Sequence, residues 1–345
     1  MRQKKELGIV AIFVALFIGY AILEAFQRGF DVAWSNPQFL GLPNLLNLTR
    51  NIGLYGTFSV AMGVVIITGG IDLSIGSLFA LLGVILAMML ESGFPWPIAV
   101  ALVILLSMFF GASNGFLISK VRLQPFVVTL CGLLTFRGLA RFISNDETKG
   151  FSDMSNYQIL NNLATGVIFN VPAPFIIFVI VCIIMAFVLH VSVYGRYLFA
   201  IGRNEDAALY SGINTKLVIT SAYILCGFLT GVSAVLIGFY TVSISPSSHG
   251  NFFELYAVAA CVIGGCSLRG GEGSVLGIFI GTAMIQLIRN IVNLQGIQSS
   301  LEFVVMGCVI LLAVLIDQAL ANRQRIRDSK IVEAKQPEPA KSPAS

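Results

Sequence analysis

The sequence predicts an all-α, polytopic helical bundle that crosses a membrane about ten times. Of its 345 residues, 57% are hydrophobic and only 11% are charged, and the mean hydropathy is +0.88. Soluble domains carry about 25% charged residues, so composition alone indicates an integral membrane protein. The apolar residues are also gathered into runs of span length, which are separated by short polar segments.

Each predicted span is an apolar run long enough to cross the hydrocarbon core of a bilayer, which takes about 20 residues of α-helix. The eighth run is short, which leaves a re-entrant or broken helix there as an alternative. The predicted spans are Leu7–Leu23, Ile52–Thr68, Leu73–Leu90, Pro97–Ile118, Phe126–Ile143, Val167–His190, Leu217–Tyr240, Phe253–Gly264, Val275–Val292 and Leu301–Leu315.

The distribution of Lys and Arg predicts that both termini lie in the cytoplasm, because cytoplasmic segments are enriched in these residues. Most of the 21 Lys and Arg residues fall in cytoplasmic segments; the exceptions are Arg28, Arg50, Arg137, Arg141, Lys149 and Arg289. We assign residues 1–320 to one membrane domain and residues 321–345 to a cytoplasmic tail. The tail is rich in Pro, Ala, Lys and Ser and has no apolar periodicity, which predicts disorder.

A polar segment between the sixth and seventh spans, residues 195–216, predicts a short helix on the cytoplasmic side. Asn204 is a suitable N-cap residue, and Glu205 places negative charge on the first turn, where the helix dipole favours it. Gly212 can end this helix in a left-handed conformation. Such a helix has no role toward lipid, so we expect a soluble partner to dock on it.

The segment Thr68–Ser77 predicts a break in a membrane helix. Gly69 and Gly70 interrupt the apolar run and free backbone groups that must find partners or water. Asp72 is costly at membrane depth unless it lines a cavity or has a partner. Either Asp72 or Ser74 caps the helix that follows, or the segment takes part in gating and substrate passage.

Charged residues at two other spans have two interpretations each. Arg137 and Arg141 lie four residues apart on one helix face, and they either extend to the lipid headgroups or contact a partner or polar substrate. Glu254 lies where the chain enters the eighth span. It either caps that helix or faces an internal pathway together with Tyr256.

Two further patterns concern packing and internal symmetry. Val64–Ser77 and Ala260–Ser274 both run from apolar residues through Gly-Gly to a polar stretch and then Gly and Ser, as in transporters built from internal repeats. Glycines at four-residue spacing allow helices to approach closely in lipid. These pairs are Gly111 with Gly115, Gly227 with Gly231, and Gly277 with Gly281.

Several catalytic classes lack their signatures in this sequence. It contains neither a Gly-x-x-x-x-Gly-Lys-Ser/Thr phosphate loop nor a His-Glu-x-x-His motif. Two histidines are too few for a multi-histidine metal centre, and the six cysteines are scattered through apolar segments at no ligand-like spacing. Runs of acidic residues typical of proton relays are also missing. Active transport would therefore draw its energy from another chain.

Five segments, in order, resemble the permease subunits of bacterial ABC importers for monosaccharides, the ribose, xylose, arabinose and galactose type that includes autoinducer-2-type permeases. The resemblance runs from residue 45 to residue 318. It implies a subunit without catalytic activity that translocates a monosaccharide or similar small polyol. The segments are Thr68–Ser77, Gln124–Gly138, Gly195–Asn214, Glu254–Gly273 and Val309–Asp317.

The same resemblance implies partners and site residues. The partners are a cytoplasmic ATPase subunit that carries ATP and Mg²⁺, a periplasmic or lipid-anchored sugar-binding protein, a second permease copy (identical or a paralogue) and the lipid of the inner membrane. No cofactor on this chain and no nucleic acid is expected. Coupling to the ATPase would fall to Arg203, Asn204, Glu205, Ala207, Ala208 and Gly212. The candidate residues for translocation or gating are Gly69, Gly70, Asp72, Ser74, Phe126, Glu254 and Tyr256.

Two departures from the family pattern and two rival functions complete the expectations. Arg203 replaces a residue that is usually small, and Tyr256 replaces one that is often acidic.

An autonomous secondary carrier or channel for a small neutral solute is the main alternative, but it leaves the capped cytoplasmic helix without a role. A membrane-embedded enzyme would need a cluster of acidic, basic or nucleophilic residues, which the sequence does not show.

Overall fold

A computed structural model of the chain describes residues 2–29, 37–151, 157–298, 301–309, 311, 312, 315 and 318. Two small antiparallel sheets, β1 with β4 and β2 with β3, accompany the helices. The strands are β1 (Lys149–Gly150), β2 (Val167–Ile168), β3 (Val171–Pro172) and β4 (Ser243–Ile244). The helices are α1 (Arg2–Arg28), α3 (Leu42–Ile67), α4 (Ile75–Glu91), α5 (Trp96–Ser119), α6 (Pro125–Ile143), α7 (Gln158–Thr165), α8 (Ala173–His190), α9 (Val193–Arg203), α10 (Glu205–Tyr210), α11 (Thr215–Thr241), α12 (Phe253–Ile263) and α13 (Val275–Leu294).

These helices confirm the predicted polytopic bundle. Seven of the described helices are long and apolar enough to cross a membrane, and α4 and α12 are shorter apolar helices. The short eighth run is the 11-residue helix α12, as the broken-helix alternative requires. The tenth predicted span, Leu301–Leu315, lies partly outside the described residues, and residues 301–309 of it are helical. The predicted tail, residues 321–345, lies outside the described residues.

Two predicted span boundaries are wrong. Helix α3 begins at Leu42 and not at Ile52, because Gly41 and a proline in the first turn start it earlier and several asparagines continue it. Helix α8 begins at Ala173 and not at Val167, because residues 167–172 form the β2–β3 hairpin. In both places the hydropathy of the sequence locates the helix but not its first turn.

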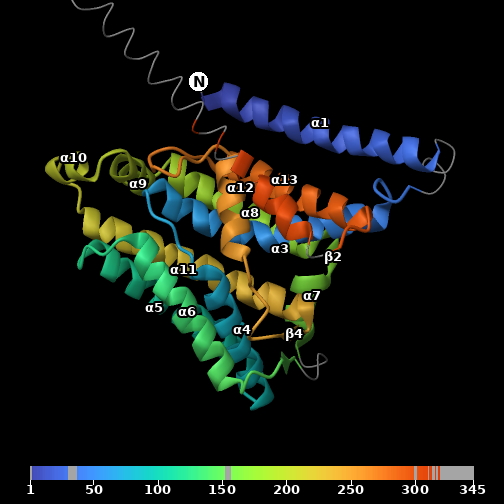
Figure 1. Cartoon of the computed structure of the whole chain (residues 1–345). Coiled ribbons are helices and arrows are strands. Elements are labelled where there is room, and N and C mark those ends of the chain that lie inside the picture. The colour runs from blue at the N-terminus through green and yellow to red at the C-terminus, as the bar shows by residue number, and fades with distance from the viewer. Residues whose placement is uncertain are drawn as a thin grey trace, which may run out of the picture.

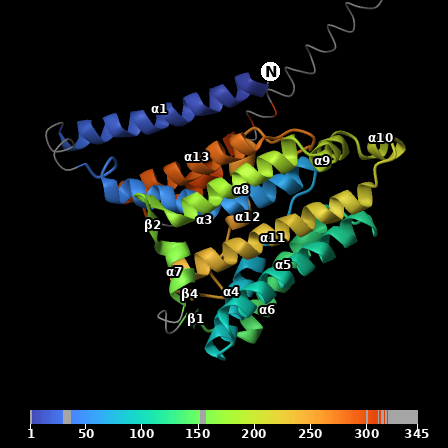
Figure 2. The same ribbon diagram turned by 180° about the vertical axis from the view of Figure 1, so that it is seen from behind.

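Helix α3 is the centre of the bundle. It packs against α8, α11, α12 and α13, and its stretch Val60–Ile67 is buried throughout. Helices α5 and α6 flank α11 and α4, and α1 lies along α13 at the edge of the bundle (Figures 1 and 2). Both views place α9 and α10 at one end of the bundle and β2, α7 and β4 at the opposite end.

The glycine pairs lie at close helix contacts, as predicted. On α5, Gly111 and Gly115 lie against the backbone of α11, and Gly227 of α11 lies against Ser107 of α5. The Ser107 hydroxyl donates a hydrogen bond to the Gly227 carbonyl oxygen at 2.6 Å. On α13, Gly277 and Gly281 pack in the same way on α12. Small residues thus bring these backbones together, which is the main attraction between helices in lipid.

We expect Gly111→Ala to destabilise the protein by about 1–3 kcal/mol, the usual cost of overpacking. A Cβ atom at this position would overlap the carbonyl oxygen of Tyr223, a backbone atom that cannot move without shifting α11. The matched control is Gly138→Ala on α6, where an added Cβ meets no atom within 4 Å. Thermal unfolding in detergent should show a lower Tm for Gly111→Ala only, and equal Tm values would contradict this account of the packing.

Candidate coupling surface and translocation site

The α9–α10 segment folds as the sequence predicts. Asn204 separates the two helices, and its side-chain oxygen accepts a hydrogen bond from the Ala207 backbone N–H at 2.9 Å, which caps α10. Glu205 lies in the first turn of α10 with Asp206. Beyond the helix, Gly212 has a φ of +86°, the left-handed conformation expected of the residue that ends it.

Helix α10 presents most of its surface outward. Ala208 is its one buried residue, whereas Tyr210 is 90% exposed and Leu209 is also exposed. An aromatic ring and a leucine beside two acidic residues make a compact amphipathic surface at the end of the bundle. Aromatic residues of this kind are typical of protein interfaces. The segment predicted to serve coupling therefore carries an exposed amphipathic surface.

The inner side of this segment touches both glycine-rich turns of the bundle. Gly202 of α9 lies so close to Ile67, the last residue of α3, that a Cβ atom on it would overlap the Ile67 carbonyl oxygen. The Gly271 N–H donates to the same carbonyl oxygen at 2.9 Å. A Cβ atom on Gly270 would lie 2.7 Å from the Gly69 nitrogen and 2.8 Å from the Gly202 oxygen. We call this contact of Ile67, Gly69, Gly202, Gly270 and Gly271 the glycine junction.

The glycine junction also brings together the two segments with internal similarity. One follows α3 and the other follows α12, and each preceding helix ends on a left-handed glycine, Gly69 or Gly265. The helices that follow each begin after a serine, Ser74 or Ser274. The predicted correspondence is therefore a correspondence of local structure, and α9 lies against both of its copies.

Asp72 is buried in the interrupted segment between α3 and α4, with 3% of its surface exposed. Its Oδ1 atom accepts hydrogen bonds from the Ser74 N–H at 2.9 Å and the Ser74 hydroxyl at 2.6 Å. Asn114 of α5 donates to that hydroxyl at 3.1 Å. Ser74 occupies the N-cap position of α4, as one interpretation predicted, but its side chain forms no capping hydrogen bond with that helix. The Asp72 carboxyl group closes a small polar network with Ser74 and Asn114.

Glu254 lies at the point where the beginnings of α4 and α12 meet. It is in the first turn of α12, two residues after the left-handed residue Phe252 that serves as N-cap. Gly76 in the first turn of α4 leaves room for its carboxyl group and for the Gly250 carbonyl, both of which a Cβ atom would overlap. Asp72 and Glu254 thus flank the same pair of helix N-termini, where negative charge is favoured.

Arg137 has a role that the sequence did not indicate. Its guanidinium group donates to the carbonyl oxygens of Pro246 at 2.8 Å and His249 at 2.7 Å. It thereby holds the loop that leads into α12. Arg141 points away from this loop and pairs with Asp146 at 2.6 Å.

Two other predicted site residues lie apart from this cluster. Phe126 is exposed in the first turn of α6. Tyr256 is buried, but it faces α13, where the Arg289 guanidinium group lies over its ring at 5.2 Å. Glu254 and Tyr256 therefore have different nearest neighbours, and their role in one common pathway stays a prediction.

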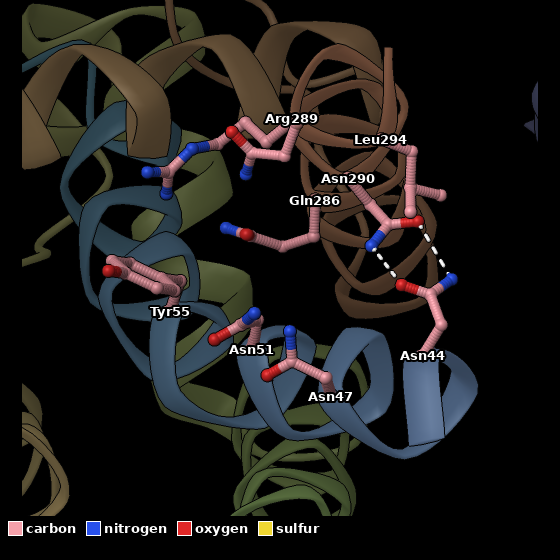
Figure 3. Close-up of a pocket in the computed structure, with 9 residues that line it drawn as sticks. Asn44, Asn47, Asn51, Tyr55, Gln286, Arg289, Asn290 and Leu294 are labelled. Carbon is pink, nitrogen blue, oxygen red and sulfur yellow. Dashed lines mark hydrogen bonds between the residues drawn. The ribbon is translucent and has the colours of Figure 1, made fainter. Parts of the chain in front are cut away.

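A polar cavity of about 270 Å³ between α3 and α13 was missed by sequence reasoning (Figure 3). Its lining is dominated by amides, with Tyr55, Arg289 and Leu294 beside them. The signal was present in the sequence, because the amides recur at helical spacing along both helices. The six amide side chains are Asn44, Asn47, Asn51, Gln286, Asn290 and Asn293.

Catalytic arrangements receive no support from the described residues. No group of three or more His, Cys, Asp or Glu side chains in the described ranges is placed to hold a metal ion. Residues 111–115 have the spacing Gly-x-Ser-x-Gly, but they lie within α5 and not on a strand-to-helix turn. Ser113 in this stretch donates to the Phe109 carbonyl oxygen of its own helix.

Comparison with known proteins places the chain in a family. The family model described as branched-chain amino acid transport system / permease component matches residues 44–314. The ribose import permease protein of Haemophilus influenzae is 34% identical over 90% of this chain and 94% of its own length. That of Bacillus subtilis is 37% identical over 82% and 87%, and the xylose transport system permease protein of Haemophilus influenzae is 31% identical over 88% and 95%.

No solved structure matches the chain. The family model nevertheless covers most of it, and the relatives align over nearly their whole length at more than 30% identity. The chain is therefore a multi-pass membrane protein that belongs to this family of transport-system permease components, together with the sugar import permeases.

Proposed function

We propose that this chain is the membrane-spanning permease subunit of an ABC importer that translocates a monosaccharide or similar small polyol. The observation that carries the proposal is the glycine junction. The capped, outward-facing helix pair α9–α10 contacts the ends of both interrupted segments of the bundle through backbone atoms. The names of the relatives, ribose and xylose permeases, support the substrate class.

The partners and the orientation follow from this assignment. The chain lies in the inner membrane with both termini and α9–α10 in the cytoplasm, and a separate ATPase subunit docks on α10 and binds ATP and Mg²⁺. This chain itself is not catalytic. A periplasmic or lipid-anchored binding protein delivers the sugar to the opposite end of the bundle, near β2, α7 and β4. A second permease copy, identical or a paralogue, completes the membrane part.

The mechanism we propose is alternating access driven through the glycine junction. When ATP binding closes the ATPase dimer, α10 moves with it and α9 moves Gly202 against Ile67 and Gly271. Because these contacts join backbone atoms, no side chain can flex to absorb the displacement. The movement reaches the starts of α4 and α12, where Asp72 and Glu254 lie. Rearrangement there opens or closes the path for the solute.

The main alternative is an autonomous secondary carrier or channel. The exposed Tyr210 and Leu209 on a capped helix argue against it, because a chain that works alone has no use for an apolar docking surface at its end. Family membership argues in the same direction, since a relative from Sinorhizobium fredii is named a probable ABC transporter permease protein.

Reconstitution tests the proposed function directly. The chain, its ATPase subunit and its binding protein are placed in proteoliposomes, and uptake of radiolabelled ribose, xylose and fructose is measured with and without ATP. We expect uptake of at least one sugar that requires ATP and all three components. Uptake by the permease alone would instead support the secondary carrier, and absence of uptake of any of these sugars by the full complex would contradict the sugar assignment.

The glycine junction generates a second prediction, for Gly202→Ala. The added methyl group must displace the Ile67 carbonyl or the Gly271 nitrogen. We expect the complex to assemble and hydrolyse ATP, but the ratio of sugar imported to ATP hydrolysed should fall by about tenfold, equivalent to about 1.4 kcal/mol of lost coupling.

Gly138→Ala serves as the control for this coupling experiment, because the same methyl group meets no neighbour there. Its ratio of import to hydrolysis should equal that of the wild type. The proposed route of coupling would be wrong if Gly202→Ala also kept the wild-type ratio. It would equally be wrong if the ATPase subunit failed to co-purify with Gly202→Ala, since the defect would then lie in docking and not in transmission.

A further inference from the structure

We propose that the amide-lined cavity between α3 and α13 is a binding subsite for a neutral, polyhydroxylated solute within a single permease chain. The inference rests on the proposed function, since it assumes that a sugar crosses this subunit. It adds a location and a set of recognising residues, and it places the subsite inside one chain and not between two copies.

The cavity is built from two facing stripes of amides. Asn44, Asn47 and Asn51 recur along one face of α3, and Gln286 and Asn290 lie one turn apart on α13. Figure 3 shows the Gln286 side chain extending into the space between the two helices, with Asn47 and Asn51 pointing toward it from α3. At about 270 Å³, the space is slightly below the roughly 300 Å³ at which small-molecule pockets begin, which suits a monosaccharide.

Gln286 is the strongest indication of a ligand. Its side chain is 4% exposed, and it forms no hydrogen bond with any described residue. The amide borders the cavity, where it can both donate a hydrogen bond to a bound hydroxyl group and accept one from it. Asn47 and Asn51 also lack side-chain hydrogen bonds within the described part of the chain, whereas Asn44 and Asn290 bond each other twice, at 2.7 and 3.1 Å. These three amides and that of Asn293, none with a side-chain hydrogen bond among the described residues, therefore line the cavity beside one closed pair.

The charges around the cavity favour a neutral ligand. Arg289 is engaged on two sides, by the Glu302 carboxylate at 2.7 Å and by the rings of Tyr55 and Tyr256, each 5.2 Å away. Its charge is thus already compensated. The remaining polar lining consists of uncharged amides, which donate and accept equally and match the hydroxyl groups of a sugar. A zwitterionic amino acid would need a free cation and a free anion instead.

A smaller space continues inward from the cavity and shares Tyr55 and Gln286 with it. It follows α12 past Phe253 and Tyr256, but its volume of about 10 Å³ holds no more than a water molecule. Gln286 therefore lies between the wide amide-lined cavity and the small one. A solute bound by the Gln286 amide could not enter the smaller cavity until α12 moves.

The test uses the full complex in proteoliposomes, with ribose, xylose and fructose as probes. Gln286→Leu and Asn51→Leu keep the approximate side-chain size but remove the amide from opposite walls. Each should lower the rate of sugar uptake at limiting concentration by roughly three- to tenfold, as expected for one lost hydrogen bond to substrate. Gly138→Ala on α6, where the added methyl group meets no neighbour, is the control and should transport like the wild type. Co-purification with the ATPase subunit checks that each variant is folded.

A second measurement reports on the cavity without transport. Asn47→Cys is introduced after the exposed Cys131 and Cys308 are replaced by Ser, and its labelling by a membrane-impermeant maleimide is followed in the complex. The transported sugar at millimolar concentration should slow the labelling, and leucine should not. This readout holds even if a Leu variant fails to fold.

The outcomes separate the two proposals. If the wild-type complex imports none of the sugars, the proposed function fails. If it imports one of them normally while both Leu variants match the Gly138→Ala control, or while that sugar gives Asn47→Cys no protection, the subsite is wrong and the proposed function stands. Protection by leucine instead of sugar would overturn the assignment of a neutral, hydroxylated ligand.

Discussion

The contact of backbone with backbone at the glycine junction is the constraint on which the rest of this structure depends. Gly202 lies directly on the Ile67 carbonyl, and the Gly271 N–H bonds that same oxygen. A side chain anywhere in this contact would separate α9 from α3 and from the loop after α12. Glycine is needed here for close approach, and the approach fixes where the exposed helix α10 stands relative to the membrane helices.

Close contacts between glycine and a neighbouring backbone recur elsewhere in the bundle. Gly76 lets the beginning of α4 meet the beginning of α12, and Gly111 and Gly227 join α5 to α11. Since apolar burial gives helices little attraction in lipid, packing of small residues and buried hydrogen bonds must hold them. Rigid contacts of this type transmit displacement well. The amide-lined cavity differs from these rigid contacts. Several of its polar side chains have no partner in the described residues, which suits the proposed site where a solute binds and leaves.

Features set by local sequence were predictable, and features set by distant residues were not. The cap at Asn204, the turn at Gly212 and the glycine pairs need only a few neighbouring residues, and each is confirmed. Arg137 was misjudged because its acceptor carbonyls, in Pro246 and His249, come from a loop more than a hundred residues away. The amide-lined cavity was missed because a hydropathy window treats asparagines as the end of a span, although here they continue α3 and line the cavity.

Hydrogen exchange in the assembled complex tests the central claim most directly. The claim is that movement of α9–α10 reaches both interrupted segments through the glycine junction. Amide exchange followed by mass spectrometry, with and without a non-hydrolysable ATP analogue, reports local opening of these segments. The account predicts that peptides covering residues 67–74 and 264–274 change their exchange together with residues 203–213. A change confined to residues 203–213 would contradict it.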